Sequence, residues 1–124
     1  MNKVLDWSKY SNFSKAEFDC KETGENEMKA EFMEKLQLLR NRYNKPMTIT
    51  SGLRSVKHSA ARNKAQGGTH TKGIACDIAC NGPEAYEIVR LAYLIGFTGI
   101  GVSQKSGARF VHLDIDERKS VWSY

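Results

Sequence analysis

Three side chains in two short segments of the sequence have the chemistry to bind a metal ion together. His70 and Asp77 stand in the segment 69–77, and His112 follows in the segment 111–114. Zinc binds imidazole nitrogens and carboxylate oxygens, and a catalytic zinc site keeps a fourth position open for water. Convergence of these residues would favour a hydrolase. The same ligand set could also hold iron or manganese.

Both segments are expected to place these residues on strands. Residue types alternate along 74–80 and along 109–115, as in strands with one buried face. In the second strand the apolar set should face the core: Val111, Leu113 and Ile115. His112 and Asp114 therefore share the opposite face, which we expect to form a cleft. Asp77 lies between two alanines on its own face, which leave room around it.

The rest of the pattern predicts an α+β fold, with a small, largely antiparallel sheet and flanking helices. Ser14 and Glu17 match a capping box at a helix start. Apolar residues at steps of three and four predict an amphipathic helix over about 27–43. The polar segment from Gly52 to Gln66 should form a loop and a short helix. A further helix should start at Asn81-Gly82-Pro83 and run to Ile95. The expected strands are 47–50, 74–80, 98–103 and 109–115, the last two joined by a turn at Ser106-Gly107.

Size and composition fit one soluble domain spanning residues 1–124, with 40% apolar and 27% charged residues. No run approaches the ~20 apolar residues that cross a bilayer. The first residues lack the features of a secretory signal, so synthesis in the cytosol is expected. The three cysteines include no Cys-x-x-Cys pair, which favours reduced, mostly buried thiols over a structural zinc ribbon.

The formal charge is +5, which favours polyanionic partners such as nucleic acid or an anionic cell wall. The basic residues are spread along the chain and are not interleaved with aromatic residues in a nucleic-acid-binding motif. A nucleic-acid binder is therefore the weaker interpretation. We expect a monomer with neither nucleic acid nor membrane as partner.

Several motifs resemble the zinc D-Ala-D-Ala carboxypeptidases of the M15 peptidase family, and most closely its short phage- and prophage-associated branch. The resemblance covers about Phe13 to Asp114 and implies a fold like that of Hedgehog and DD-peptidase domains. Thr69 departs from the family's Ser-x-His motif, since Gly68 holds the serine position. The matching segments are Ser51-Gly52-Leu53-Arg54-Ser55, Asn63, Gly67-Gly68, residues 70–77 and His112-Leu113-Asp114.

This resemblance implies that His70, Asp77 and His112 bind zinc. It also implies that Arg54 grips a substrate carboxylate, a role that suits a planar guanidinium. Ser51 and His58 are weaker candidates for the same role. The expected substrate is the stem peptide of peptidoglycan.

The catalytic base is harder to assign, because many relatives carry a Glu or Asp three residues before the second zinc histidine. This chain has Arg109 there, which cannot act as a base at neutral pH. Asp114 is the best substitute, because it shares a strand face with His112 and could reach water at the metal. It could equally orient His112 by accepting the other ring N–H.

The expected function is therefore a zinc-dependent peptidoglycan peptidase, either a carboxypeptidase or an endolysin-like endopeptidase. Such an enzyme would act on the cell wall, and a phage-encoded one would be released at lysis or carried on the virion. The alternative is a non-catalytic, zinc-containing module that binds the cell wall and has lost its base. Arg109 is the feature that favours this alternative.

Overall fold

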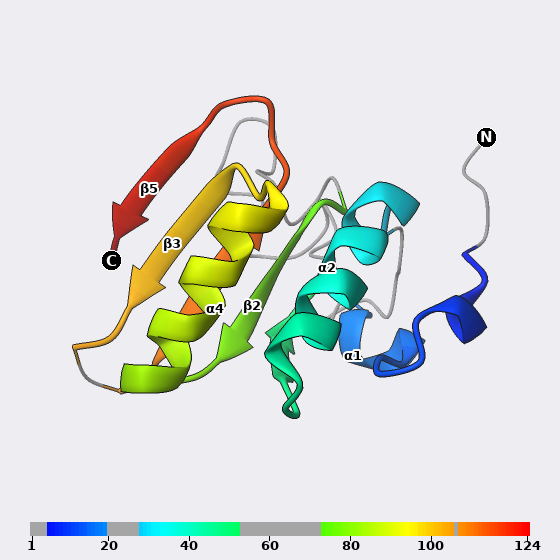
Figure 1. Cartoon of the computed structure of the whole chain (residues 1–124), viewed down its shortest axis with the longest axis horizontal. Helices are drawn as coiled ribbons and strands as arrows, with labels where there is room; N and C mark the ends of the chain where they lie inside the picture. The colour runs from blue at the N-terminus through cyan, green and yellow to red at the C-terminus, as the bar shows by residue number, and fades with distance from the viewer. Residues whose placement is uncertain (1–4, 20–27, 53–72, 106) are drawn as a thin grey trace.

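The computed structural model of the chain describes residues 5–19, 28–52, 73–105 and 107–124 (Figure 1). The predicted α+β class is confirmed. Helices and strands follow the order η1 (Trp7–Lys9), α1 (Lys15–Phe18), α2 (Ala30–Tyr43), β1 (Thr48–Ser51), β2 (Ala75–Ala79), α4 (Gly82–Ile95), β3 (Gly99–Ser103), β4 (Phe110–Asp114) and β5 (Ser120–Ser123).

The helices begin and end where local chemistry satisfies their free backbone groups. At α1 the predicted capping box is confirmed, with the backbone N–H of Ser14 donating to Glu17 Oε1 at 2.7 Å. Helix α2 starts at Ala30, later than predicted, and ends at Asn44 in the left-handed conformation. Gly96 ends α4 in the same way, at φ 106°. Within the part of the chain that the structure describes, no helix is long and apolar enough to cross a membrane.

The five strands form one sheet in the order β1-β2-β4-β3-β5. Strand β4 lies in the centre and runs antiparallel to both β2 and β3. Helix α4 connects β2 to β3, so β4 is inserted between two strands that run in the same direction. Strand β5 was not predicted: it is short and lies at the edge of the sheet, where it pairs with β3 in parallel.

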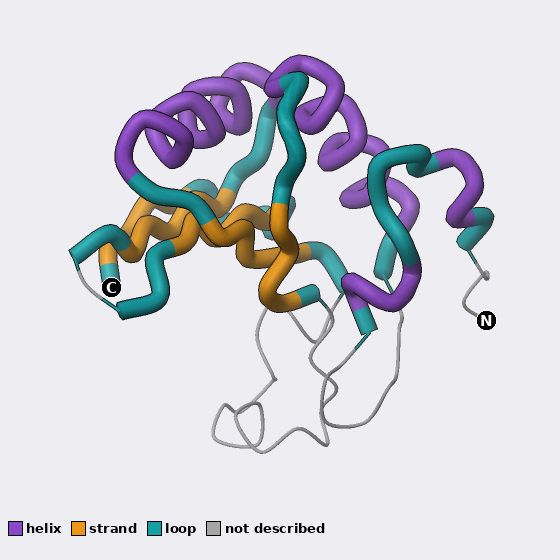
Figure 2. The backbone as a smooth tube through the Cα atoms, turned by 90° about the horizontal axis from the view of Figure 1, so that it is seen from below, coloured by secondary structure: helices purple, strands orange, loops and turns teal. Residues whose placement is uncertain are grey.

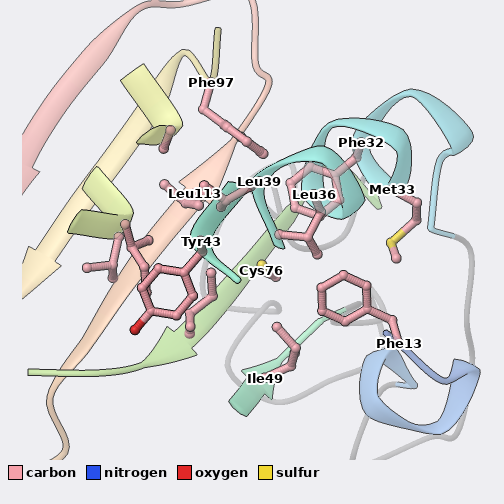
Figure 3. Close-up of a cluster of buried hydrophobic side chains, with 14 of the residues drawn as sticks. Phe13, Phe32, Met33, Leu36, Leu39, Tyr43, Ile49, Cys76, Phe97 and Leu113 are labelled. Carbon is pink, nitrogen blue, oxygen red and sulfur yellow. The ribbon is translucent and has the colours of Figure 1, made fainter. Parts of the chain in front are cut away.

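Helices α2 and α4 both cover the same face of the sheet (Figure 2). The core lies between these two layers, and Figure 3 shows side chains from α2, β1, β2 and β4 meeting there. Val111 and Leu113 are fully buried in it, which confirms the predicted inward face of β4. The alternate residues of β2 and β4 therefore project from the face that α2 and α4 do not cover.

The cysteines described in the structure are free thiols, as expected from the sequence. Cys76 is fully buried on the core face of β2, and burial raises its pKa well above the ordinary value. Burial raises the pKa of Cys80 to about 11. Neither thiol is thus an activated nucleophile near neutral pH. Cys20 lies outside the described residues.

Candidate metal centre

A row of residues, one from each strand, crosses the sheet on the face away from α2 and α4. Strand pairing puts Ser51 opposite Asp77, Asp77 opposite His112, His112 opposite Gly101, and Gly101 opposite Trp122. Directly opposed side chains on one face of a sheet have Cβ atoms about 4.5–5.5 Å apart. The register thus brings Asp77 and His112 together, although they are distant in the sequence.

The imidazole of His112 lies between two carboxylates. Its Nδ1 is 3.0 Å from Asp77 Oδ1, and its Nε2 is 2.8 Å from Asp114 Oδ2. The second carboxylate oxygen of Asp114 accepts the backbone N–H of Asp116 at 3.1 Å. His112 is 4% exposed and Asp114 is 3% exposed, so both side chains of this contact are withdrawn from solvent. Asp77 is only partly buried, so among Asp77, His112 and Asp114 it is the side chain most accessible to solvent.

The two carboxylates set the protonation of this imidazole. Burial by itself lowers the pKa of His112, but hydrogen bonds to Asp114 and Asp77 and the negative charges of both residues raise it. The raising effects dominate, so the pKa of His112 lies above its ordinary value. A metal ion binds the neutral imidazole and therefore competes with a proton for Nδ1.

Glycine at position 99 makes room for the Asp114 carboxylate. Gly99 is the partner of Asp114 in the β3–β4 pairing, and a Cβ atom on Gly99 would overlap both carboxylate oxygens. Asp114 is almost completely buried and both of its carboxylate oxygens are hydrogen-bonded, so the carboxylate has little freedom to move aside. The missing side chain on β3 is thus a condition for the contact between Asp114 and His112.

Gly99→Ala should lower the free energy of unfolding by about 1–3 kcal/mol, because the added methyl group overfills this position. Urea denaturation measures the effect. In a double-mutant cycle with Asp114→Ala, the added methyl group should cost far less, since the carboxylate it meets is gone. Equal costs in both backgrounds would show that the overlap with Asp114 is not the cause.

The predicted site residues divide into those that the structure brings together and those outside the described residues. Asp77, His112 and Asp114 form the contacts above. Ser51 ends β1 opposite Asp77, after a shift in the pairing register between Ile49 and Ser51. The predicted zinc ligand His70 and the candidate substrate residues Arg54 and His58 lie outside the described residues.

Arg109 does not lie beside these carboxylates. It stands one residue before β4 and lines a cavity of about 440 Å³ together with Cys80 and Glu84. Glu84 belongs to α4, which covers the other face of the sheet. Strand alternation gives the same result, since positions 109 and 112 have opposite parity. An acidic residue at position 109 of this chain would therefore point away from His112.

The donor pair fits a zinc ion. Two ligand atoms bound at ~2.0–2.1 Å in tetrahedral geometry are separated by about 3.3 Å, close to the 3.0 Å between His112 Nδ1 and Asp77 Oδ1. Both atoms face one another, and Asp114 holds the other imidazole nitrogen as carboxylates do behind metal-binding histidines. Among the described residues no group of three His, Cys, Asp or Glu side chains is arranged to hold a metal ion.

Two features of the site were missed from the sequence. Gly99 and Gly101 alternate with apolar residues in the predicted strand 98–103, and glycine inside a strand often marks a close approach of another group. That signal was available. Trp122 had no comparable signal, because the strand that carries it was itself not predicted.

Comparison with known proteins gives the family. The family model described as Peptidase M15 matches residues 9–114, most of the chain. The chain belongs to the M15 peptidase family, which supports its assignment as a peptidase. A search of curated proteins found no match.

Proposed function

We propose that the protein is a zinc-dependent peptidase that hydrolyses an amide bond in the stem peptide of peptidoglycan. Membership of the M15 family supports the reaction class. The observation that carries the metal assignment is the facing pair of His112 Nδ1 and Asp77 Oδ1, 3.0 Å apart on neighbouring strands. The +5 formal charge suits an anionic cell wall.

Asp77 and His112 would hold the zinc ion, with His70 as the third ligand by family resemblance. When bound, zinc polarises the scissile carbonyl and makes water acidic enough to react near neutral pH. Arg54 would bind the substrate carboxylate through two hydrogen bonds. Ser51, opposite Asp77 in the row, would be a further candidate for contact with the substrate.

Asp114 is assigned the role of orienting His112. Its carboxylate accepts from Nε2 of the imidazole and from the backbone of Asp116, and it is almost completely buried. These contacts direct Nδ1 toward Asp77. To act instead as the catalytic base, the other role open to it, Asp114 would have to give up its hydrogen bond to His112. We therefore favour orientation over proton transfer.

The non-catalytic alternative has lost its main argument. Arg109 favoured it by occupying the position where many relatives carry the Glu or Asp that acts as the catalytic base, but that side chain lines a cavity with Cys80 and Glu84. Its identity thus says little about the chemistry at His112. We retain the module only as an outcome of the experiment below.

The test is hydrolysis of purified peptidoglycan by the full chain loaded with zinc. Release of free D-alanine indicates a carboxypeptidase, and new amino termini on soluble peptides indicate an endopeptidase. A chelator should abolish the release, and added zinc should restore it. Zinc binding with no released product, together with sedimentation of the protein with the cell wall, would establish the binding module instead.

A further inference from the structure

We propose that Trp122 is a positioning residue of the metal centre, which holds the imidazole of His112 so that Nδ1 faces Asp77. The inference rests on the proposed zinc site and extends it to β5, the edge strand. The indole and the imidazole are in contact, with ring centroids 5.1 Å apart and planes inclined by 50°.

This contact spans an intervening strand. Neighbouring strands lie ~4.8 Å apart, so the backbones of β4 and β5 are separated by roughly 10 Å with β3 between them. Gly101 is the residue of β3 between His112 and Trp122. A Cβ atom there would lie 2.6 Å from Cε2 and Nε1 of the indole. The indole thus occupies the space over Gly101 and reaches His112 across it.

The two hydrogen bonds of His112 leave one motion that the indole can restrict. Asp77 and Asp114 hold the ring at its two nitrogens, 3.0 Å and 2.8 Å away. They fix the line through those nitrogens, but the ring can still rock about that line. A large aromatic ring packed against the imidazole opposes rocking and keeps Nδ1 directed at one position.

Trp122 is itself held in place by its neighbours. The backbone N–H of Ser120 donates to Thr98 at 2.8 Å, and that of Tyr124 donates to Val102 at 3.3 Å, which fixes β5 on either side of the indole. The ring of Tyr124 meets the indole edge-on, with centroids 6.5 Å apart. These contacts hold Trp122 against the imidazole of His112.

The experiment measures zinc affinity by calorimetry on the metal-free full chain, which needs no substrate. Trp122→Ala should weaken zinc binding about 10-fold, the lower end of what loss of an outer partner of a metal ligand costs. Trp122→Phe keeps an aromatic ring and should stay within about threefold of the wild type. Val121→Ala is the matched control, because Val121 is the preceding residue on β5, is 73% exposed and should not change affinity.

A second measurement covers the case in which Trp122→Ala does not fold. In a Trp7→Phe background Trp122 is the only tryptophan, and zinc binding beside His112 should change its fluorescence. Gly101→Ala, which displaces the indole without removing it, should weaken binding to a similar extent.

The possible outcomes separate failure of the positioning role of Trp122 from failure of the proposed peptidase function. Wild-type affinity in a folded Trp122→Ala variant, or unchanged Trp122 fluorescence while calorimetry records binding, overturns the positioning role and leaves the proposed function intact. Zinc binding that depends on Trp122 without any peptidoglycan hydrolysis supports the positioning role and overturns the peptidase. A wild-type chain that binds no zinc overturns both.

Discussion

His112→Ala should abolish zinc binding and reduce peptidoglycan hydrolysis by more than about 100-fold. Loss of a residue that only supports a metal ligand costs up to about 100-fold, and loss of the ligand itself should cost more. The substitution removes a proposed ligand and also separates the two carboxylates from their common partner. Asp77 lies 3.0 Å from one imidazole nitrogen and Asp114 lies 2.8 Å from the other. Metal analysis and product release, measured on the same preparation, test the expectation.

The same substitution should destabilise the fold, which must be separated from loss of the metal. Removing one partner of a buried charged pair typically costs about 3–5 kcal/mol, and Asp114 is buried. His112→Gln is the control, because its amide can still donate to a carboxylate while binding zinc poorly. A folded His112→Gln variant that keeps stoichiometric zinc would contradict the assignment of His112 as a ligand.

Asp114→Asn should weaken zinc binding about 10–100-fold and leave the turnover number at saturating zinc within about 10-fold of the wild type. The variant retains the size of the side chain but has one acceptor oxygen. In the wild type, His112 Nε2 and the backbone N–H of Asp116 each have their own carboxylate oxygen as acceptor, at 2.8 Å and 3.1 Å. One of these two donors would face an amide NH2 group, so His112 would be held less firmly.

The opposite pattern would assign Asp114 as the catalytic base. In that case zinc affinity stays near the wild-type value and the turnover number falls by about 100-fold or more. Arg109→Glu, one residue before the same strand, is the matched control, since it restores the acidic residue that many relatives carry there. Because Arg109 lines a cavity with Glu84 of α4, the new carboxylate should not raise activity or rescue Asp114→Asn.

Alternation along the strands made much of the site predictable from the sequence. Val111 and Leu113 face the core, so His112 and Asp114 had to share the other face of β4. Alternation gives a face but no pairing register. That β2 lies beside β4 with Asp77 opposite His112 depends on the assembled sheet and is not encoded in either segment alone.

The roles of β3 and β5 were not predictable in this way. Gly99 and Gly101 are conspicuous in a strand, but what fills the space above them depends on two other strands. Strand β5 has only four residues. It follows the predicted hairpin in the sequence and pairs with the first strand of that hairpin, β3. Short edge strands carry weak periodicity, so pattern alone does not identify them.

The row that crosses the sheet also has a consequence for folding. Its members come from all five strands, and the two facing donors, Asp77 and His112, are separated along the chain by helix α4 and strand β3. Pairings between segments far apart in sequence close late and slowly as a chain folds. A partly folded chain that has not yet paired β2 with β4 has no ligand pair to offer. If zinc binds as proposed, its uptake should follow completion of the sheet, and the bound ion should slow unfolding of the protein.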